Sequence, residues 1–481
     1  MHASKSAFTP PLRTALLPWW VVTALAAGVA VTPAHAQTSL PAPSGAPLSI
    51  DAASDPILAF GRSTGPKDGF VRTISAAVNR NPALTEAEAQ IAEGRAQRGQ
   101  ARAGLFPSAD VTISSYRVID RQFGSAGLTN VVERTRPNAQ TDGLLSINQL
   151  AFDGGATFKR ISAANSRIQA AVAGVDDAAS RVALSTIGAW YDVFSYRAML
   201  ELAEQYRRDQ AARRGDLQQR IDQGAAAVAD LARVDSAVAS VDTRIASYRR
   251  QLANAEARFT ELTGSLPPAG ITRGPALGTL PPSLEAARAA AADVPAVQAA
   301  QAQARAARYD ASAAQRDTYP TVGLSVDSGR YGVFETDRDY DVRGRVTLRA
   351  RIGGGIQARA DQASARRAAA EARASTALEE AGRDAAIAWS DLDALNDQIE
   401  ALQASYIASR QSRDTIAERF RLTRGTLDDL LDANDTYFTA AASYIDTLAD
   451  RDAARYVLLA RTGRLLDAIG IRSANETFHI P

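Results

Sequence analysis

Motifs from the first half of the sequence recur in the second half at nearly constant distances. Two motifs recur 213 residues later: Asn81-Pro82-Ala83-Leu84 as Val294-Pro295-Ala296-Val297, and Leu105-Phe106-Pro107 as Thr318-Tyr319-Pro320. Two others recur 199 residues later: Trp190 as Trp389, and Leu262-Thr263-Gly264 as Arg461-Thr462-Gly463. An internal repeat of this kind restricts the fold to architectures built from two related halves.

The repeat divides the chain into two halves and three connecting or terminal segments. We expect a first structural repeat over 70–264 and a second over 284–470, joined by a Pro- and Gly-rich linker over 265–283. Residues 37–69 are rich in Pro, Ser, Gly and Ala without sustained periodicity, which predicts a flexible N-terminus of the mature chain. Residues 471–481 form a short C-terminal tail.

The first 36 residues have the pattern of a secretory signal peptide. Lys5 and Arg13 precede an apolar run from Trp19 to Val31, and small residues end at Ala36. The run is shorter than the roughly 20 residues that a membrane-spanning helix needs. We therefore expect cleavage before Gln37 and an exported chain whose membrane crossing, if any, is made by strands.

Composition argues against catalysis and against nucleic-acid binding. Cysteine is absent, and histidine occurs only at His2, His35 and His479, of which the first two would leave with the signal peptide. Thiolate metal sites, cysteine nucleophiles and histidine-based acid–base chemistry are therefore almost excluded, and we expect no enzyme activity, cofactor or metal site. A formal net charge of +1 gives no global field that would attract nucleic acid.

Each half contains very long helical segments. The stretch from Gly154 to about Ile221 would be roughly 100 Å long as one α-helix, far more than a compact domain holds. Apolar residues then step by three and four from Leu231 to Leu262, the spacing of a coiled-coil seam. In the segment expected to pack on this seam, apolar residues recur every seven positions at Ile161, Ile168, Val175 and Val182.

Short segments before each long helix alternate between apolar and polar residues. In 341–352, Val342, Val346 and Leu348 share one side and the arginines between them share the other. The expected strands are 107–118, 141–152, 320–331 and 341–352. Each has the length of a tilted membrane strand, but a half-buried soluble sheet explains the strand pairs equally well. Four strands cannot enclose a lumen, so a barrel would need several copies of the chain.

With these features the chain resembles the TolC family of outer-membrane efflux and secretion ducts. The resemblance covers about 70–470 and rests on the duplication, on Phe152-Asp153-Gly154-Gly155 and Gly353-Gly354-Gly355, and on the run from Arg424 to Ala433. It implies a mainly α fold with a duplicated helix-strand-strand-helix-helix unit. Three chains would form one 12-stranded β-barrel in the outer membrane, continued by a long α-helical barrel in the periplasm.

The resemblance also implies roles for residues at both ends of the duct. The glycine breaks Gly224 and Gly425, with Arg424, would mark the tips that dock a periplasmic adaptor. Asp429 and Asp432 match acidic residues that narrow the periplasmic entrance, although acids in a first helical turn also suit the helix dipole. Family members often carry an arginine after this glycine, whereas Arg424 precedes it, so the bridging partner is undefined.

On the strand that ends near residue 352, Arg343, Arg345 and Arg349 would face the barrel lumen and make it basic. A basic lumen, the segment Tyr331-Gly332-Val333-Phe334-Glu335 and the absence of a lipidation cysteine resemble family members that serve type I protein secretion. Drug efflux is the second choice. The inner-membrane partner would be an ABC transporter or a proton-driven pump. The alternatives outside the family are a periplasmic coiled-coil adaptor and a scaffold protein, neither of which needs duplicated amphipathic strands.

Overall fold

The computed structural model describes residues 40–45, 50–122, 137–335, 339–422 and 424–474. These belong to one compact unit, Gln37–Pro481. The predicted signal peptide lies outside the described residues, as does His479.

Each half of the chain has the same order of elements, so the predicted duplicated unit is confirmed. The first half comprises α1 (Pro56–Arg62), α2 (Lys67–Arg80), α3 (Pro82–Ala103), β1 (Ser108–Arg117), β2 (Ala139–Phe152), α5 (Ala156–Asp222) and α6 (Val228–Thr263). The second comprises α7 (Leu284–Ala290), the 3-10 turn η2 (Ala291–Asp293), α8 (Pro295–Arg316), β3 (Thr321–Arg330), β4 (Tyr340–Arg349), α9 (Ile356–Arg421), α10 (Leu427–Arg461) and α11 (Leu465–Ile469).

Glycine turns set where the two longest helices begin. Gly155 and Gly355 take left-handed conformations, with φ of 83° and 76°, immediately before α5 and α9. A residue with a Cβ rarely adopts such a conformation, so each glycine pair lets the chain turn sharply out of a strand and start a helix. The helices then run for 67 and 66 residues without a break.

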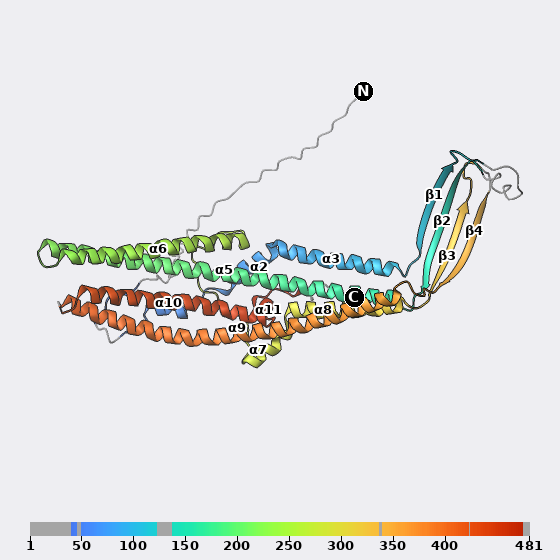
Figure 1. The fold of residues 1–481 in the computed structure, drawn as a ribbon. Coiled ribbons are helices and arrows are strands. Elements are labelled where there is room, and N and C mark those ends of the chain that lie inside the picture. Colours follow the sequence, from blue (N-terminus) through green and yellow to red (C-terminus); the bar gives the residue numbers. More distant parts are fainter. Residues whose placement is uncertain (1–39, 46–49, 123–136, 336–338, 423, 475–481) are drawn as a thin grey trace, which may run out of the picture. The chain divides into compact units, whose positions relative to one another are not determined.

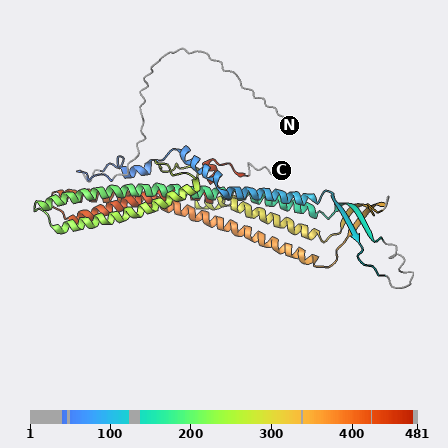
Figure 2. The same cartoon turned by 90° about the horizontal axis from the view of Figure 1, so that it is seen from above.

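The helices lie side by side in the same order as the strands that they extend. Next to the sheet, α3 packs on α5, α5 on α8 and α8 on α9. Farther from the sheet, α6 packs on α5, α5 contacts α10, and α10 packs on α9. Figures 1 and 2 show these elements running lengthwise, with the four strands at one end and the α5–α6 and α9–α10 turns at the other.

The apolar seam of α6 packs as its spacing predicts. Val234, Val241 and Phe259 are buried, and none of the ten seam residues is exposed. The prediction of which α5 residues pack against this seam was only partly correct. Ile168 and Val175 of α5 pack against α3 instead, because α6 ends at Thr263, alongside Trp190.

The N-terminal segment corrects a second expectation. Residues 37–69 were expected to be flexible, but α1 lies within them, and Ile57, Leu58 and Phe60 are buried in the main core. The side chain of Asp55 caps α1 by accepting hydrogen bonds from the amides of Ile57 and Leu58, at 2.8 and 2.9 Å. The composition of residues 37–69 did not indicate this helix, because only one of its turns is strongly apolar.

The segment between the two repeats is also held in place. Arg273 is 5% exposed and forms an ion pair of 2.7 Å with Asp452 of α10. Its guanidinium also donates to the carbonyl oxygen of Phe60 at 2.7 Å. One buried cation therefore joins the linker, α10 and the N-terminal segment.

Candidate functional site

The four strands form one antiparallel sheet in the order β1-β2-β3-β4. β1 and β4 are its two edges. β4 ends at Arg349, so Ala350 and Ile352 do not extend the apolar side of the strand as 341–352 predicted. The glycine turn that begins at Gly353 takes the chain out of the sheet.

One face of the sheet is mostly apolar across all four strands. Residues that pair directly across antiparallel strands point to the same face. The rows nearest the helices are Val342, Ser328, Leu145 and Val111; Gly344, Val326, Ile147 and Ala109; Val346, Leu324 and Gln149; and Leu348 and Val322. The row farther from the helices is Tyr340, Arg330, Gly143 and Ile113. Val346, Leu348, Val111 and Ile113 are each more than 70% exposed in the single chain. An exposed apolar surface of this extent marks an interaction with lipid or another protein.

The opposite face is polar and carries both signs of charge. Arg343 pairs with Asp327, which pairs with Ser146, which pairs with Asp110. Arg345 lies 3.6 Å from Asp327, and Arg343 forms an ion pair with Asp341.

The predicted arginines Arg343, Arg345 and Arg349 therefore do lie together on this face. Four carboxylates share the face with them, those of Asp110, Asp142, Asp327 and Asp341. The face that carries these arginines is therefore of mixed charge and not uniformly basic.

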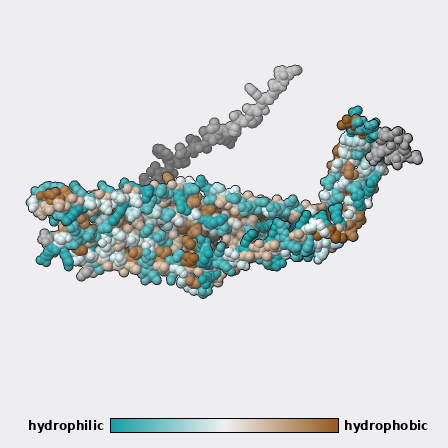
Figure 3. Space-filling view, viewed as in Figure 1, coloured by the Kyte–Doolittle hydropathy of each residue, from teal (hydrophilic) through white to brown (hydrophobic). Residues whose placement is uncertain are grey.

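Exposed aromatic side chains gather where the strands meet the helices. They are Phe106, Phe152, Phe158 and Tyr319. Figure 3 shows apolar side chains at this junction, below the sheet. Aromatic girdles of this kind flank the lipid-facing band of outer-membrane proteins. None of the helices in the described part of the chain has the length and apolarity that crossing a membrane requires.

The far end of the helices carries the predicted entrance residues. Gly224, at the α5–α6 turn, has a φ of 74°, a conformation that favours glycine. Gly425, at the α9–α10 turn, has no such conformation. A Cβ at this position would lie 3.3 Å from the backbone nitrogen of Phe420, so here glycine permits a close approach of the chain to itself.

The structure brings Asp429 and Asp432 together on one surface. Both are exposed, and both line a shallow groove of about 290 Å³ with Ser409, Ser412 and Ile416 of α9. The amide of Asp429 also donates to the hydroxyl of Thr426, the N-cap of α10, at 3.1 Å. Asp429 therefore belongs to a helix start and to the groove at the same time.

The same face of α10 continues as a polar stripe. Thr436, Thr439, Ser443, Asp446 and Asp450 follow Asp432 at helical spacing on the side of α10 away from its core contacts. Partial desolvation raises the pKa of Asp450, and repulsion from Asp446 and from Asp192 of α5 raises it further.

Two ion pairs that the sequence did not reveal join α10 to α6. Asp428 lies 3.1 Å from Arg233, and Asp435 lies 2.8 Å from Arg244. The guanidinium of Arg220 also lies over the ring of Phe420, 5.7 Å from its centre. Arg424 is exposed and forms no ion pair among the described residues. Arg233, which follows the first break, is thus one of the cations that bridge the hairpins near the tip.

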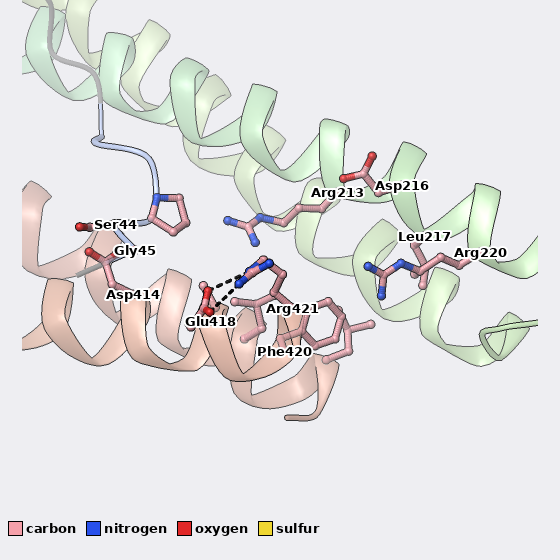
Figure 4. Close-up of a pocket in the computed structure, with 14 residues that line it drawn as sticks. Ser44, Gly45, Arg213, Asp216, Leu217, Arg220, Asp414, Glu418, Phe420 and Arg421 are labelled. Atoms are coloured by element: carbon pink, nitrogen blue, oxygen red, sulfur yellow. Dashed lines mark hydrogen bonds and ion pairs between the residues drawn. The ribbon is translucent and has the colours of Figure 1, made fainter. Parts of the chain in front are cut away.

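A cavity of about 560 Å³ lies between the hairpins near the tip. Figure 4 shows its walls: α5 supplies Arg213 and Leu217, and α9 supplies Asp414 and Phe420. Residues 43–45 form another side. Burial and the nearby charge of Arg413 lower the pKa of Arg213. Within the described residues no group of three or more His, Asp or Glu side chains is placed to hold a metal ion.

The family model of the outer membrane efflux proteins matches residues 73–265 and 286–464. The chain belongs to this family. It is 24% identical over 337 residues to the outer membrane efflux protein BepC of Brucella suis biovar 1, a match that covers 69% of this chain and 74% of BepC.

Solved structures show the same fold. The outer membrane protein VceC of Vibrio cholerae is similar with a TM-score of 0.71 and 18% identity, over 82% of this chain and 96% of VceC. The open state of the MtrE outer membrane channel of Neisseria gonorrhoeae is similar with a TM-score of 0.67 and 18% identity, over 82% of this chain and 89% of MtrE.

Membership of the outer membrane efflux family fixes the class of function. The chain is an outer-membrane channel of a tripartite export system, with its helices in the periplasm, and not an enzyme. The adaptor and scaffold alternatives are set aside, since neither accounts for the sheet or for the family match.

The facing of β4 can be tested at two adjacent residues of this efflux protein. Val346 lies on the apolar face and Thr347 on the polar face. We expect Val346→Arg to cost about 2–4 kcal/mol if the residue lies near the bilayer midplane, and Thr347→Arg to be tolerated. The measurement is the amount of assembled protein in the outer membrane. Equal losses from both substitutions would show that the assigned facing is wrong.

The raised pKa of Asp450 predicts a pH-dependent effect on stability. Because the folded state binds this proton more tightly than the unfolded state, stability falls as pH rises through the raised pKa. Asp450→Asn should therefore increase the melting temperature of the purified protein at pH 7 and leave it unchanged at pH 3. The control is Asp435→Asn, which breaks the ion pair with Arg244 and should give no increase. An increase of the same size at both pH values would contradict the assignment.

Proposed function

We propose that three copies of this chain close into one duct that conducts small molecules from the periplasm to the exterior. The observation that carries the proposal is the match between the open edges of the sheet and those of the helical layer. Among the described residues, β1 and β4 have no neighbouring strand on their outer sides, and α3 and α9, which flank the helical layer next to the sheet, are open on the same sides. Joining β4 of one copy to β1 of the next also brings α9 against the neighbouring α3.

Three copies give 12 strands, which is enough to enclose a lumen, whereas the four strands of one chain cannot close a barrel. Closure would turn the apolar rows outward to lipid and place Arg343, Arg345 and Arg349 in the lumen. The same closure leaves no exposed strand edge within the membrane, where unpaired backbone groups are costly.

We further propose that the groove with Asp429 and Asp432 faces the axis of the helical barrel and forms the entrance. Three copies would place six carboxylates around a narrow opening, and the stripe that ends at Asp450 would continue the acidic lining above it. Such an arrangement attracts cations and repels anions.

Two observations favour small-molecule efflux as the transport task. BepC is described as an efflux protein, and the polar face of the sheet carries four carboxylates beside its three arginines. That face offers no uniform basic surface that would select acidic protein cargo. Protein export remains the second candidate because of the segment Tyr331-Gly332-Val333-Phe334-Glu335.

The tips around Gly224, Arg424 and Gly425 are proposed to dock a periplasmic adaptor, which would link the duct to an ABC transporter or a proton-driven pump in the inner membrane. Arg424 is exposed and unpaired among the described residues, as a contact for a partner would be.

The entrance can be tested by conductance in planar bilayers. We expect the wild-type channel to be cation-selective and to be blocked by divalent or trivalent cations from the periplasmic side. Replacing Asp429 and Asp432 by Ala should remove most of the block and weaken cation selectivity while the trimer persists.

The matched control is the double substitution of Asp428 and Asp435 by Ala, which removes two carboxylates per chain from the same helix. Both control residues are already paired, with Arg233 and Arg244. If the control abolishes block while the Asp429 and Asp432 variant retains it, the constriction lies elsewhere in the tip.

A further inference from the structure

Residues 40–45 and 50–62, here called the N-terminal strap, contact the α9–α10 hairpin, which carries the groove with Asp429 and Asp432. The strap includes α1, the short blue helix beside α10 in Figure 1. It is bound to α9 and α10 through buried polar contacts and not only through its apolar residues, which makes its attachment specific.

Asp55 is the centre of this attachment and is 1% exposed. Its carboxylate accepts a hydrogen bond of 2.9 Å from the hydroxyl of Tyr406 and forms an ion pair with Arg410, both on α9. The Tyr406 hydroxyl also lies 3.0 Å from the hydroxyl of Tyr437 on α10. One strap residue is therefore linked to both helices of the hairpin.

A second attachment lies one helical turn closer to the tip. Arg413 of α9 donates to the carbonyl oxygen of Pro41 in the strap at 2.9 Å. Its guanidinium also lies over the ring of Tyr437, 4.3 Å from the ring centre. The two attachments share Tyr437, so they hold the same turn of α10.

The strap and the entrance groove occupy the same turns of the hairpin. The groove residues of α9 are Ser409, Ser412 and Ile416, and the strap contacts are Tyr406, Arg410 and Arg413. On α10, Tyr437 directly follows the groove residue Thr436. Movement of these turns would change the groove and the strap contacts together.

The contact between this hairpin and α5 is incompletely satisfied beneath the strap. Asp414 is fully buried and lines the cavity of Figure 4. It forms an ion pair with Arg413, but neither of its oxygens accepts a hydrogen bond within the described part of the chain. Because that ion pair lies within α9, Asp414 does not hold α9 to α5 in the described part of the chain.

We propose that the N-terminal strap is a clamp that holds the entrance hairpin closed and that its release widens the entrance. Asp55 and Tyr406 are positioning residues in this device, and Asp414 does not oppose opening, because its ion pair lies within α9. The inference rests on the proposed function, because it assumes that the groove with Asp429 and Asp432 forms the entrance.

The test uses the full-length trimer and three single substitutions. Tyr406→Phe removes only the hydroxyl that links Asp55 to Tyr437, and Asp55→Asn removes the charge that pairs with Arg410. The control, Asp51→Asn, alters an exposed strap residue whose carboxylate accepts from the amide of Ala53 within the strap. Each variant is measured for single-channel conductance in planar bilayers and for thermal melting of the trimer.

We expect the open fraction of the Tyr406→Phe and Asp55→Asn channels to rise about 2- to 10-fold, the effect of one lost buried hydrogen bond on a two-state equilibrium. Asp51→Asn should behave as wild type. A cysteine at Ala417, which lines the cavity, should also react faster with a thiol reagent in the Tyr406→Phe background.

Melting changes with wild-type conductance and wild-type labelling would show that the strap is only structural and would overturn the proposal. Should Asp55→Asn fail to assemble, Tyr406→Phe decides the result. Wild-type protein that forms no channel would contradict the proposed function, and labelling at Ala417 would still report on the strap.

Discussion

The backbone groups along the outer edges of β1 and β4 are the constraint on which the rest of the structure depends. Each edge presents a row of N–H and C=O groups with no partner in the sheet. In lipid such groups must be satisfied by other backbone groups, because no water is available to them. One chain cannot satisfy both edges with four strands, so the sheet has to be completed by further copies.

The arrangement of the helices follows from the arrangement of the strands. Glycine turns at Gly155 and Gly355 connect strand to helix directly, so the order of the strands sets the order of the helices. α5 lies between neighbours and is buried along most of its length, whereas the first half of α9 is largely exposed. An edge helix with Leu378 and Ile387 exposed suits a position against a neighbouring copy. The far end of α9 is bound by the N-terminal strap.

Local periodicity was sufficient to predict the parts of the fold that repeat along the sequence. The 3 and 4 spacing from Leu231 to Leu262 predicted α6, and the alternation around Val346 predicted β4. The mixed charge of the polar face is also visible in the sequence, since Asp341 shares the alternation of Arg343 and Arg345. The break at Gly425 was predicted, but the reason for glycine there was not, because a close approach to Phe420 depends on the path of the chain.

Contacts between distant segments were beyond prediction from one sequence. Asp55 and Tyr406 are 351 residues apart, and no spacing rule connects them. The same holds for Arg273 with Asp452 and for the packing of Ile168 on α3. The first two contacts are made by single buried polar groups, which leave no periodic pattern in the sequence. The packing of Ile168 depends on which of two neighbouring helices lies beside it, and periodicity does not indicate this either.

Cross-linking of the two sheet edges tests the central claim most directly, because the natural chain has no cysteine. β1 and β4 lie at opposite edges of one sheet, so a disulfide between them can join only different copies. One cysteine in β1, at Thr112, would be combined in turn with cysteines at Arg343, Arg345 and Thr347 of β4. We predict that at least one pair gives a ladder ending at covalent trimers in the outer membrane, and that either cysteine alone gives none. No cross-link from any pair, or a ladder that stops at dimers, would contradict closure by three copies.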